Sequence, residues 1–191
     1  MGQCMSLMPL SGQILIATPK LRQSMFEKSL IFICEHHEQG SVGLMINRPT
    51  SFALSYIFEQ IGIKDHAAHR QQLPLLFGGP IQPERGFVLH HPTGKWRSSL
   101  IITPNEVTLT TSNDIIRALA ANVGPSDVIV TLGYTAWEPL QLEDEIKNDF
   151  WLVCPYQKDL LYDVAYAERW ICAGNLMGLA IENMTLGTGH A

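Results

Sequence analysis

Residues 29–49 read SLIFICEHHEQGSVGLMINRP and contain two apolar runs separated by a short polar turn. The first run, 29–35, is apolar at both alternating sets of positions, which is typical of a strand covered on both faces. The second run, 42–47, follows a turn at 37–40 that ends in glycine. Two such runs joined by a few turn residues predict a β-hairpin. Because its ends carry Glu, His, Asn and Arg, this hairpin is also a candidate site.

The flanking sequence predicts further strands and a smaller number of helices. Apolar runs bounded by turn residues predict strands at 10–18, 74–77, 86–90, 100–103, 107–110, 128–134 and 150–154. Helical spacing predicts helices that open at 49–51 and after Ser112, and others over 140–146 and 166–177. Hairpins mixed with single helices favour an α+β fold over a doubly wound parallel sheet.

The composition limits the class of protein. The chain has 191 residues, of which 46% are hydrophobic and 16% charged, as expected for one compact domain. Its net charge is −5 and its basic residues are scattered, so nucleic acid is not an expected partner. We find no secretory signal, no apolar run of about 18 residues and no CxxC pair. A cytoplasmic protein without a membrane partner is expected.

We expect a single domain over residues 10–181, with flexible ends at 1–9 and 182–191. The opening MGQCMS also fits a loose pattern for N-terminal myristoylation.

Four candidate site residues lie on the hairpin. Glu35 and His36 flank its turn, whereas Asn47 and Arg48 lie at the opposite end. Strand pairing alone therefore does not bring the two pairs together. The planar guanidinium of Arg48 is suited to a carboxylate or a phosphate. Alternatively, Glu35 and His36 order the turn and Arg48 forms a structural ion pair.

Four further candidates lie in two other segments. Gly78 and Gly79 precede a proline and can present backbone N–H groups to an anion, or simply form a tight turn that ends a strand. Tyr134 and Trp137 follow a central strand and can line a pocket. Trp137 is equally expected in the core, because aromatic rings bury large areas.

Catalytic and metal signatures are missing from the sequence. There is no G-x-S-x-G or HExxH motif, and Ser41 has the wrong spacing for a nucleophile elbow. The adjacent pairs His36-His37 and His90-His91 are each predicted on a strand, where neighbours point to opposite faces. We therefore expect no metal and no cofactor.

A series of short motifs resembles the YqgE/AlgH family of bacterial proteins over about residues 7–180. The matching motifs are Leu10-Ser11-Gly12-Gln13, Ile16-Ala17-Thr18-Pro19, Glu35-His36, Gly40, Gly43-Leu44, Asn47-Arg48-Pro49, Gly78-Gly79-Pro80, Gly133-Tyr134, Trp137, Gln141-Leu142-Glu143 and Trp151-Leu152-Val153. The resemblance implies one cytosolic α+β domain, with a mixed, largely antiparallel sheet curled into an irregular pseudo-barrel and flanked by helices. It supplies no reaction, only a regulatory association with alginate synthesis and a transcriptional-regulator label.

The chain departs from this family after Tyr134. The family pattern GYAGWGxGQLE has small residues where this chain has Ala136, Glu138 and Leu140. The resulting loop is bulkier and stiffer, which argues against a close approach of its backbone to a ligand.

Three functions are compatible with these observations. The first is a non-catalytic binding or regulatory protein that holds an anionic small molecule or a protein partner at Arg48, the two glycines and segment 134–137. The second is a hydrolase-type enzyme with His36 as general base and Arg48 as anion stabiliser. The third is a structural interaction protein that acts through the apolar face of helix 166–177 and forms oligomers.

Overall fold

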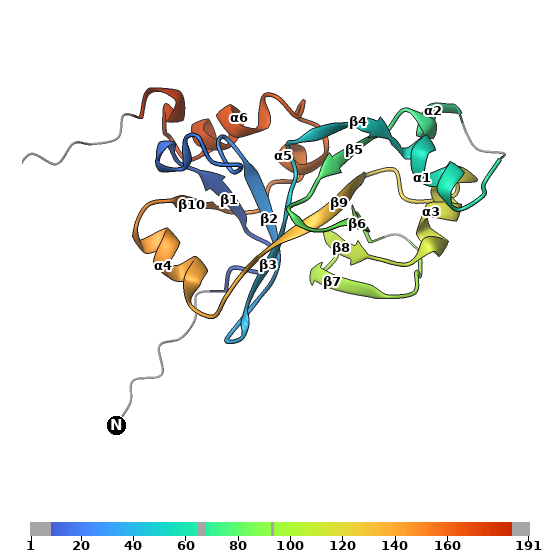
Figure 1. Ribbon diagram of the computed structural model, residues 1–191, viewed down its shortest axis with the longest axis horizontal. Helices are drawn as coiled ribbons and strands as arrows, with labels where there is room; N and C mark the ends of the chain where they lie inside the picture. Colours follow the sequence, from blue (N-terminus) through green and yellow to red (C-terminus); the bar gives the residue numbers. More distant parts are fainter. Residues whose placement is uncertain (1–8, 65–67, 93, 185–191) are drawn as a thin grey trace, which may run out of the picture.

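The computed structural model describes residues 9–64, 68–92 and 94–184, in which the chain forms strands and short helices (Figure 1). The strands are β1 (Ile14–Ala17), β2 (Leu30–His37), β3 (Gly40–Met45), β4 (Pro49–Ala53), β5 (Pro74–Phe77), β6 (Ile81–His90), β7 (Ser99–Thr103), β8 (Val107–Thr110), β9 (Val128–Trp137) and β10 (Trp151–Cys154). The helices are α1 (Leu54–Gln60), α2 (Ala68–Gln71), α3 (Asn113–Ala120), α4 (Gln141–Lys147), α5 (Lys158–Tyr162) and α6 (Arg169–Leu176).

In the described ranges the strands join one curled sheet in the order β10-β1-β2-β3-β9-β6-β8-β7. Strand β4 pairs with β5, and β5 joins β9 in the parallel direction. The other recorded pairings are antiparallel. The predicted α+β fold with a mixed, largely antiparallel sheet is therefore confirmed.

The long strand β9 divides the sheet into two halves. Its first part pairs with β5 and β6, and its last three residues, Thr135–Trp137, pair with β3. Figure 1 shows β9 running diagonally between the two halves of the sheet. We call β1–β3, β10 and α4 the hairpin half, and β4–β8 with α1 and α3 the cleft half.

Helices cover both faces of the hairpin half, as its doubly apolar strands predict. On one face Leu30 and Phe32 pack in a cluster with Trp170 of α6. On the other, Ile31 and Ile33 pack with the buried side chains contributed by α4 and its flanking strands. In the cleft half, a third cluster joins α1 and α3 to β5, β6 and β9. These three clusters hold the elements from which the candidate sites are built.

The predicted hairpin is confirmed, although its turn is shorter than expected because pairing continues to His37 and Gly40. The hairpin of β7 and β8 is also confirmed. The helix predicted to open at 49–51 begins only at Leu54, and residues 49–53 form β4 instead. Pairing with β5, supported by a 2.9 Å hydrogen bond from Thr50 Oγ1 to the Leu75 carbonyl, overrides the helical start signal.

Other element boundaries also differ from the sequence prediction. The first strand is limited to 14–17, because residues 11–12 form a turn. Strand β6 begins at Ile81 and β9 continues to Trp137, since long-range pairing extends both. The last predicted helix begins at Arg169, and α5 was not predicted. The myristoylation pattern at 1–6 lies outside the described residues.

In the described part of the chain, no helix has both the length and the apolar character needed to span a bilayer.

Candidate functional site

At the turn end of the hairpin, His36 lies in a buried line of polar groups. Its ring is 2% exposed, whereas that of His37 is 53% exposed, so the two neighbours do point to opposite faces. His36 Nδ1 lies 2.8 Å from Ser41 Oγ, and Nε2 lies 3.8 Å from a carboxylate oxygen of Glu143 on α4. The line joins helix α4 to the hairpin.

A serine, a histidine and a glutamate are also the residue types of a hydrolase catalytic triad. Ser41, however, is only 4% exposed. In the described part of the chain, Ser41 and His36 are not among the residues that line the clefts of about 620, 380, 280 and 230 Å³. A nucleophile must reach the substrate atom that it attacks. The geometry therefore favours a structural role for this line.

Trp137 is buried beside the same helix and shares its anchor with a second tryptophan. The indole N–H groups of Trp137 and Trp151 donate to one oxygen of Glu145, at 2.9 and 2.7 Å. Gln141 donates to the other oxygen at 2.8 Å. The two indoles meet edge to face, with ring centroids 6.0 Å apart. Trp137 is thus placed as a core anchor that fixes α4.

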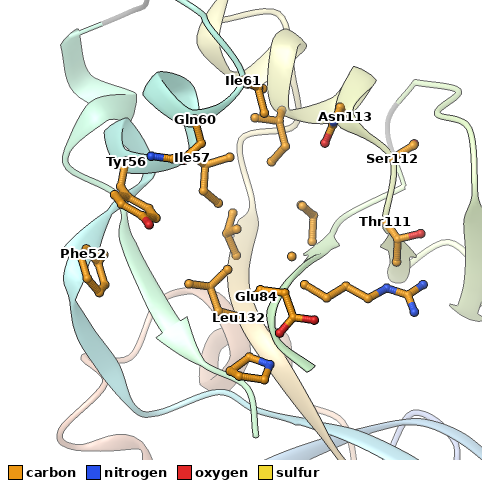
Figure 2. A pocket seen from close by; sticks show the side chains of 16 residues that line it. Phe52, Tyr56, Ile57, Gln60, Ile61, Glu84, Thr111, Ser112, Asn113 and Leu132 are labelled. Carbon is orange, nitrogen blue, oxygen red and sulfur yellow. The ribbon is translucent and has the colours of Figure 1, made fainter. Parts of the chain in front are cut away.

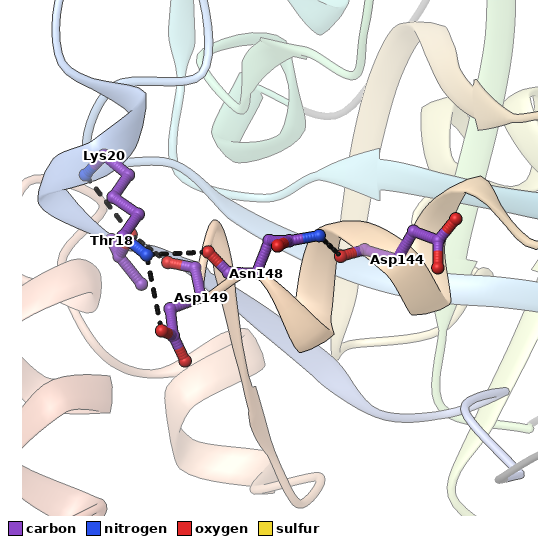
Figure 3. Close-up of polar contacts among 5 residues, drawn as sticks. All are labelled: Thr18, Lys20, Asp144, Asn148 and Asp149. Carbon is purple, nitrogen blue, oxygen red and sulfur yellow. Dashed lines mark hydrogen bonds and ion pairs between the residues drawn. The ribbon is translucent and has the colours of Figure 1, made fainter.

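The other end of α4 is held by the segment after β1 (Figure 3). Lys20 Nζ donates to the carbonyl of Asn148 at 2.8 Å and lies 3.3 Å from the carboxylate of Asp149. Thr18 Oγ1 donates to the Asp149 carbonyl at 2.6 Å. A cation at the carboxyl end of a helix complements its dipole. Both ends of α4 are therefore tied to neighbouring elements.

Asn47 and Arg48 close the opposite end of the hairpin. The Asn47 amide accepts from the N–H of Leu30 and donates to the carbonyl of Lys28, each at 2.9 Å. The Arg48 guanidinium donates to the carbonyl of Glu27. The predicted ion-pair partner of Arg48 is thus replaced by a backbone oxygen. Both side chains hold the loop before β2 against the hairpin.

The structure does not bring the two hairpin ends together. Ser41 pairs with His36, whereas Met45, three residues before Arg48, pairs with Ile31. Five residues of strand separate these registers, which is about 17 Å at the usual rise. A single site that contains both His36 and Arg48 does not form.

Gly78 and Gly79 lie where two backbones cross in close contact. A Cβ on Gly78 would lie 2.2 Å from the carbonyl oxygen of Gly133, and one on Gly79 would lie 2.2 Å from the backbone of Tyr134. The Gly78 N–H already donates to the Leu132 carbonyl at 2.8 Å. These glycines permit the crossing of β9, and the Gly78 N–H is unavailable to an anion.

Glu35 and Tyr134, from different predicted segments, share a cleft. They line a depression of about 380 Å³ that is also lined by Arg85 and Phe87. The Tyr134 ring meets Phe87 edge to face at 5.6 Å. The eight predicted residues are thus distributed over four places. Asn47 and Arg48 share a second, smaller depression of about 280 Å³.

A larger cleft of about 620 Å³ lies in the cleft half and was not predicted (Figure 2). Phe52 and Tyr56 stand on one side, and the segment 111–113 that leads into α3 stands on the other. The side chains between them are largely aliphatic. They are Ile57, Ile61, Val88, Ile116, Val130 and Leu132.

The rim of this cleft combines exposed rings with one charged pair of neighbours. Phe52 is 48% exposed and Tyr56 is 40% exposed, and their rings lie 4.7 Å apart. Glu84 and Arg85, consecutive residues of β6, both line the cleft. Exposed aromatic side chains beside an aliphatic floor are typical of a binding surface. The chain can therefore hold an apolar group here.

Arg85 lines both clefts and leaves its charge open to a ligand. Its guanidinium lies 3.3 Å from the amide oxygen of Gln82 and 5.2 Å from the centroid of the Phe87 ring. Among the described residues, no carboxylate lies within ion-pair distance of it. The sequence offered one indication of this site, because β6 begins with the largely polar run 82–85 and continues with apolar residues. The position of Arg85 beside α1 and α3, however, follows only from the tertiary structure.

Two buried titratable groups, His90 and Cys34, have structural roles and do not form part of a candidate site. The ring of His90 lies within 2.9 Å of Thr110 Oγ1 and 2.8 Å of the His91 carbonyl. Burial lowers the pKa of His90 below its usual value, so the neutral ring is favoured. Burial raises the pKa of the Cys34 thiol, which disfavours the nucleophilic thiolate.

Comparisons with known proteins point to one family. A family model described as AlgH-like matches residues 14–182. A UPF0301 protein of Legionella pneumophila strain Lens is 54% identical over 95% of this chain and 97% of its own length. Another, of Chromobacterium violaceum, is 39% identical over 98% of this chain and 100% of its own length.

Solved structures agree with this match. The solution structure of the AlgH protein of Pseudomonas aeruginosa is similar, with a TM-score of 0.78, 35% sequence identity and full coverage of both chains. A crystal structure of a protein of Corynebacterium diphtheriae has a TM-score of 0.68 at 19% identity, covering 94% of this chain and 90% of that one. The latter likeness concerns the fold alone.

Proposed function

This chain belongs to the AlgH-like family, and we propose that it is a non-catalytic binding protein whose ligand occupies the cleft between α1, β6 and the start of α3. The observation that carries the proposal is the combination of an aliphatic floor, exposed aromatic rings and a lining arginine, Arg85, which has no carboxylate within ion-pair distance among the described residues. The regulatory association of the AlgH name is compatible with ligand binding.

The proposed ligand has an apolar body and one anionic group. The floor offers only van der Waals contact and burial, which favours an apolar body at roughly 25 cal/mol per Å². Arg85 supplies a fork of donors that suits a carboxylate, sulfonate or phosphate. Ser112 and Asn113 add polar side chains on the side of the cleft opposite Phe52 and Tyr56. A small amphipathic anion fits these features better than a sugar or a nucleotide.

The hydrolase alternative has one observation in its favour, the line from Ser41 through His36 to Glu143. It would require an opening of the hairpin half, because the serine and the imidazole are buried. An intact protein in which Ser41→Ala abolishes an esterase activity would support it. We retain it as the second candidate on that single geometric feature.

The proposal is tested by titrating the full chain with 1-anilinonaphthalene-8-sulfonate, which has an aromatic body and one sulfonate. We expect saturable binding with one probe per chain. Arg85→Gln should weaken it by roughly fivefold, the effect of about 1 kcal/mol from one solvent-exposed charge-assisted contact. Glu84→Gln should leave binding unchanged or tighten it, because it removes a negative charge from the same cleft.

Arg117→Gln is the matched control for this titration. Arg117 is an exposed residue of α3 in the same half and does not line the cleft. It should leave probe affinity unchanged. If Arg85→Gln and Arg117→Gln behave alike, or if the probe binds without saturation, the cleft is not the binding site.

A further inference from the structure

The depression of about 280 Å³ lies between the closed end of the hairpin and helix α6. Glu27, Lys28, Asn47 and Arg48 line it on the hairpin side, and four residues within 166–171 line it on the helix side. We call it the hairpin-end cleft. It shares no lining residue with the cleft of the proposed function, so it is a separate place on the molecule.

Lys28 and Arg48 bring two positive charges to the hairpin-end cleft. The Lys28 ammonium lies over the face of the Trp170 ring, 5.6 Å from its centroid. The Arg48 guanidinium donates to the Glu27 carbonyl through one terminal nitrogen, which leaves further N–H groups available. Among the described residues, no carboxylate lies within ion-pair distance of either cation. Both charges can therefore meet an anion in the cleft.

The lining residues that carry acceptor groups already hold the surrounding loop. The Asn47 amide accepts from the Leu30 N–H and donates to the Lys28 carbonyl, each at 2.9 Å. The Glu27 carboxylate accepts from the N–H of Gln23 at 3.0 Å. The free hydrogen-bonding capacity of the cleft is therefore mainly that of donors, which favours an anionic ligand.

A third cation lies buried behind the helix side of the cleft. Arg169 is 2% exposed, and its guanidinium carbon lies 4.3 Å from the centroid of the Tyr166 ring, which lines the cleft. It donates to the carbonyls of Val164 and Ile46. Burial lowers the pKa of Arg169 to about 10, so it stays charged at neutral pH.

The buried charge of Arg169 has no close counter-charge in the described part of the chain. Asp163 raises the pKa of Arg169, but no carboxylate lies within ion-pair distance of the guanidinium. Buried charges in proteins are normally paired. An anion in the hairpin-end cleft, on the other side of Tyr166, would supply a negative charge nearby.

A smaller cleft of about 230 Å³ adjoins the hairpin-end cleft and shares Glu27, Lys28 and Trp170 with it. The exposed side chains of Arg22 and Glu182 line its outer part. One donates and the other accepts, which suits hydroxyl groups because these do both. Trp170 is only 5% exposed and offers little apolar surface. The body of a molecule that extends this way is therefore polar.

We propose that the hairpin-end cleft binds the phosphate group of a small hydroxylated phosphate monoester, held between Lys28 and Arg48. A phosphate monoester carries a charge of about −1.5 to −2 at neutral pH, which matches two cations better than a carboxylate does. The Arg48 fork suits phosphate oxygens. Tyr166 adds a hydroxyl donor, because burial raises its pKa and keeps it protonated.

The first test is an NMR titration of the isotope-labelled full chain with glycerol 2-phosphate, inorganic phosphate and acetate at one pH and ionic strength. We expect saturable shifts in amides of 27–30, 47–48 and 166–171, which surround the cleft. Glycerol 2-phosphate should bind tightest and acetate at least about fivefold more weakly, because acetate carries one charge. Equal affinity of inorganic phosphate would overturn the hydroxylated body and assign free phosphate to the cleft.

Substitutions at the two cations test the contacts. Lys28→Gln should weaken binding of glycerol 2-phosphate by about fivefold, and it removes an exposed side chain. Arg48→Gln should weaken it at least as much, although it also removes the bond to the Glu27 carbonyl. Glu27→Gln should tighten binding, because it removes a negative charge from the cleft. Lys147→Gln, at an exposed position of α4, is the matched control and should bind like the wild type.

Cross-titration separates this site from the proposed function. Arg85→Gln should leave glycerol 2-phosphate binding unchanged, and Lys28→Gln should leave binding of the anilinonaphthalene probe unchanged. The proposal is overturned if glycerol 2-phosphate does not saturate, or if its shifts centre away from 27–30, 47–48 and 166–171. It is also overturned if Lys28→Gln and Lys147→Gln weaken binding alike, because that would show a general effect of surface charge.

Discussion

The hairpin half and the cleft half use their polar side chains in opposite ways. In the hairpin half, Glu145 accepts from Trp137 and Trp151, and His36 is enclosed between Ser41 and α4. In the cleft half, Arg85 has an amide and an aromatic face as neighbours and remains open to solvent. The contrast shows that, where helices cover both faces of the sheet, residues of catalytic type hold those helices in place. The proposed binding cleft lies where α1 and α3 leave part of the sheet uncovered.

The largest expected effect contrasts two glycines. Gly78→Ala should lower the free energy of unfolding by at least about 3 kcal/mol, because its Cβ would lie 2.2 Å from the backbone of Gly133. Gly86→Ala, in the wall of the cleft, meets no atom within 4 Å and should be neutral or slightly stabilising. Urea unfolding monitored by tryptophan fluorescence measures both. Equal losses would contradict the close crossing of β9.

A smaller loss is expected from the anchor of α4. Glu145→Ala leaves two indole N–H groups without their acceptor and should cost about 2–4 kcal/mol. Asp144→Ala changes the neighbouring exposed carboxylate of the same helix and should change stability by less than about 0.5 kcal/mol. The same urea titration compares them. If both variants are neutral, Trp137 is not held as described.

The cleft half should show its own pH dependence through His90. Because burial lowers the pKa of folded His90, the unfolded chain binds more protons there, and stability rises with pH. That contribution should be complete above the ordinary pKa of 6.5 and decline as the pH falls below it. His90→Gln should reduce this slope, relative to the wild type, in unfolding titrations at several pH values. Identical slopes in the variant and the wild type would argue against a neutral buried ring.

The smallest effect on stability is expected at the rim of the cleft. Phe52→Ser should change the free energy of unfolding by less than about 1 kcal/mol, because the ring is already 48% exposed. The same variant should weaken binding of the anilinonaphthalene probe. Thermal unfolding and probe titration on one sample separate the two. A large loss of stability without a loss of binding would make Phe52 a core residue instead.

Much of the fold could be predicted because it depends on local patterns. The doubly apolar run 29–35 identified a strand covered on both faces, and the turn that follows it identified the hairpin. The error at 49–53 arose because helical spacing begins only at Leu54, and pairing with β5 is invisible in the local sequence. The extensions of β6 and β9 were missed for the same reason.

The candidate sites were harder to predict because reactive residue types say nothing about exposure. Sequence alternation placed His36 and His37 on opposite faces, but not which face α4 would cover. Gly78 was considered as an anion nest, although the need for it comes from a strand more than fifty residues away. Arg85 carries no signature, and its cleft exists only once α1 and α3 pack beside β6.

The most direct test of the central claim is an NMR titration of the isotope-labelled full chain with the anilinonaphthalene probe. The account predicts saturable shifts in backbone amides of 52–61, 82–88 and 111–116, which surround the cleft. Amides of 45–48 and 134–141 should move much less. Saturable shifts that centre on those two segments, with the cleft unaffected, would contradict the account.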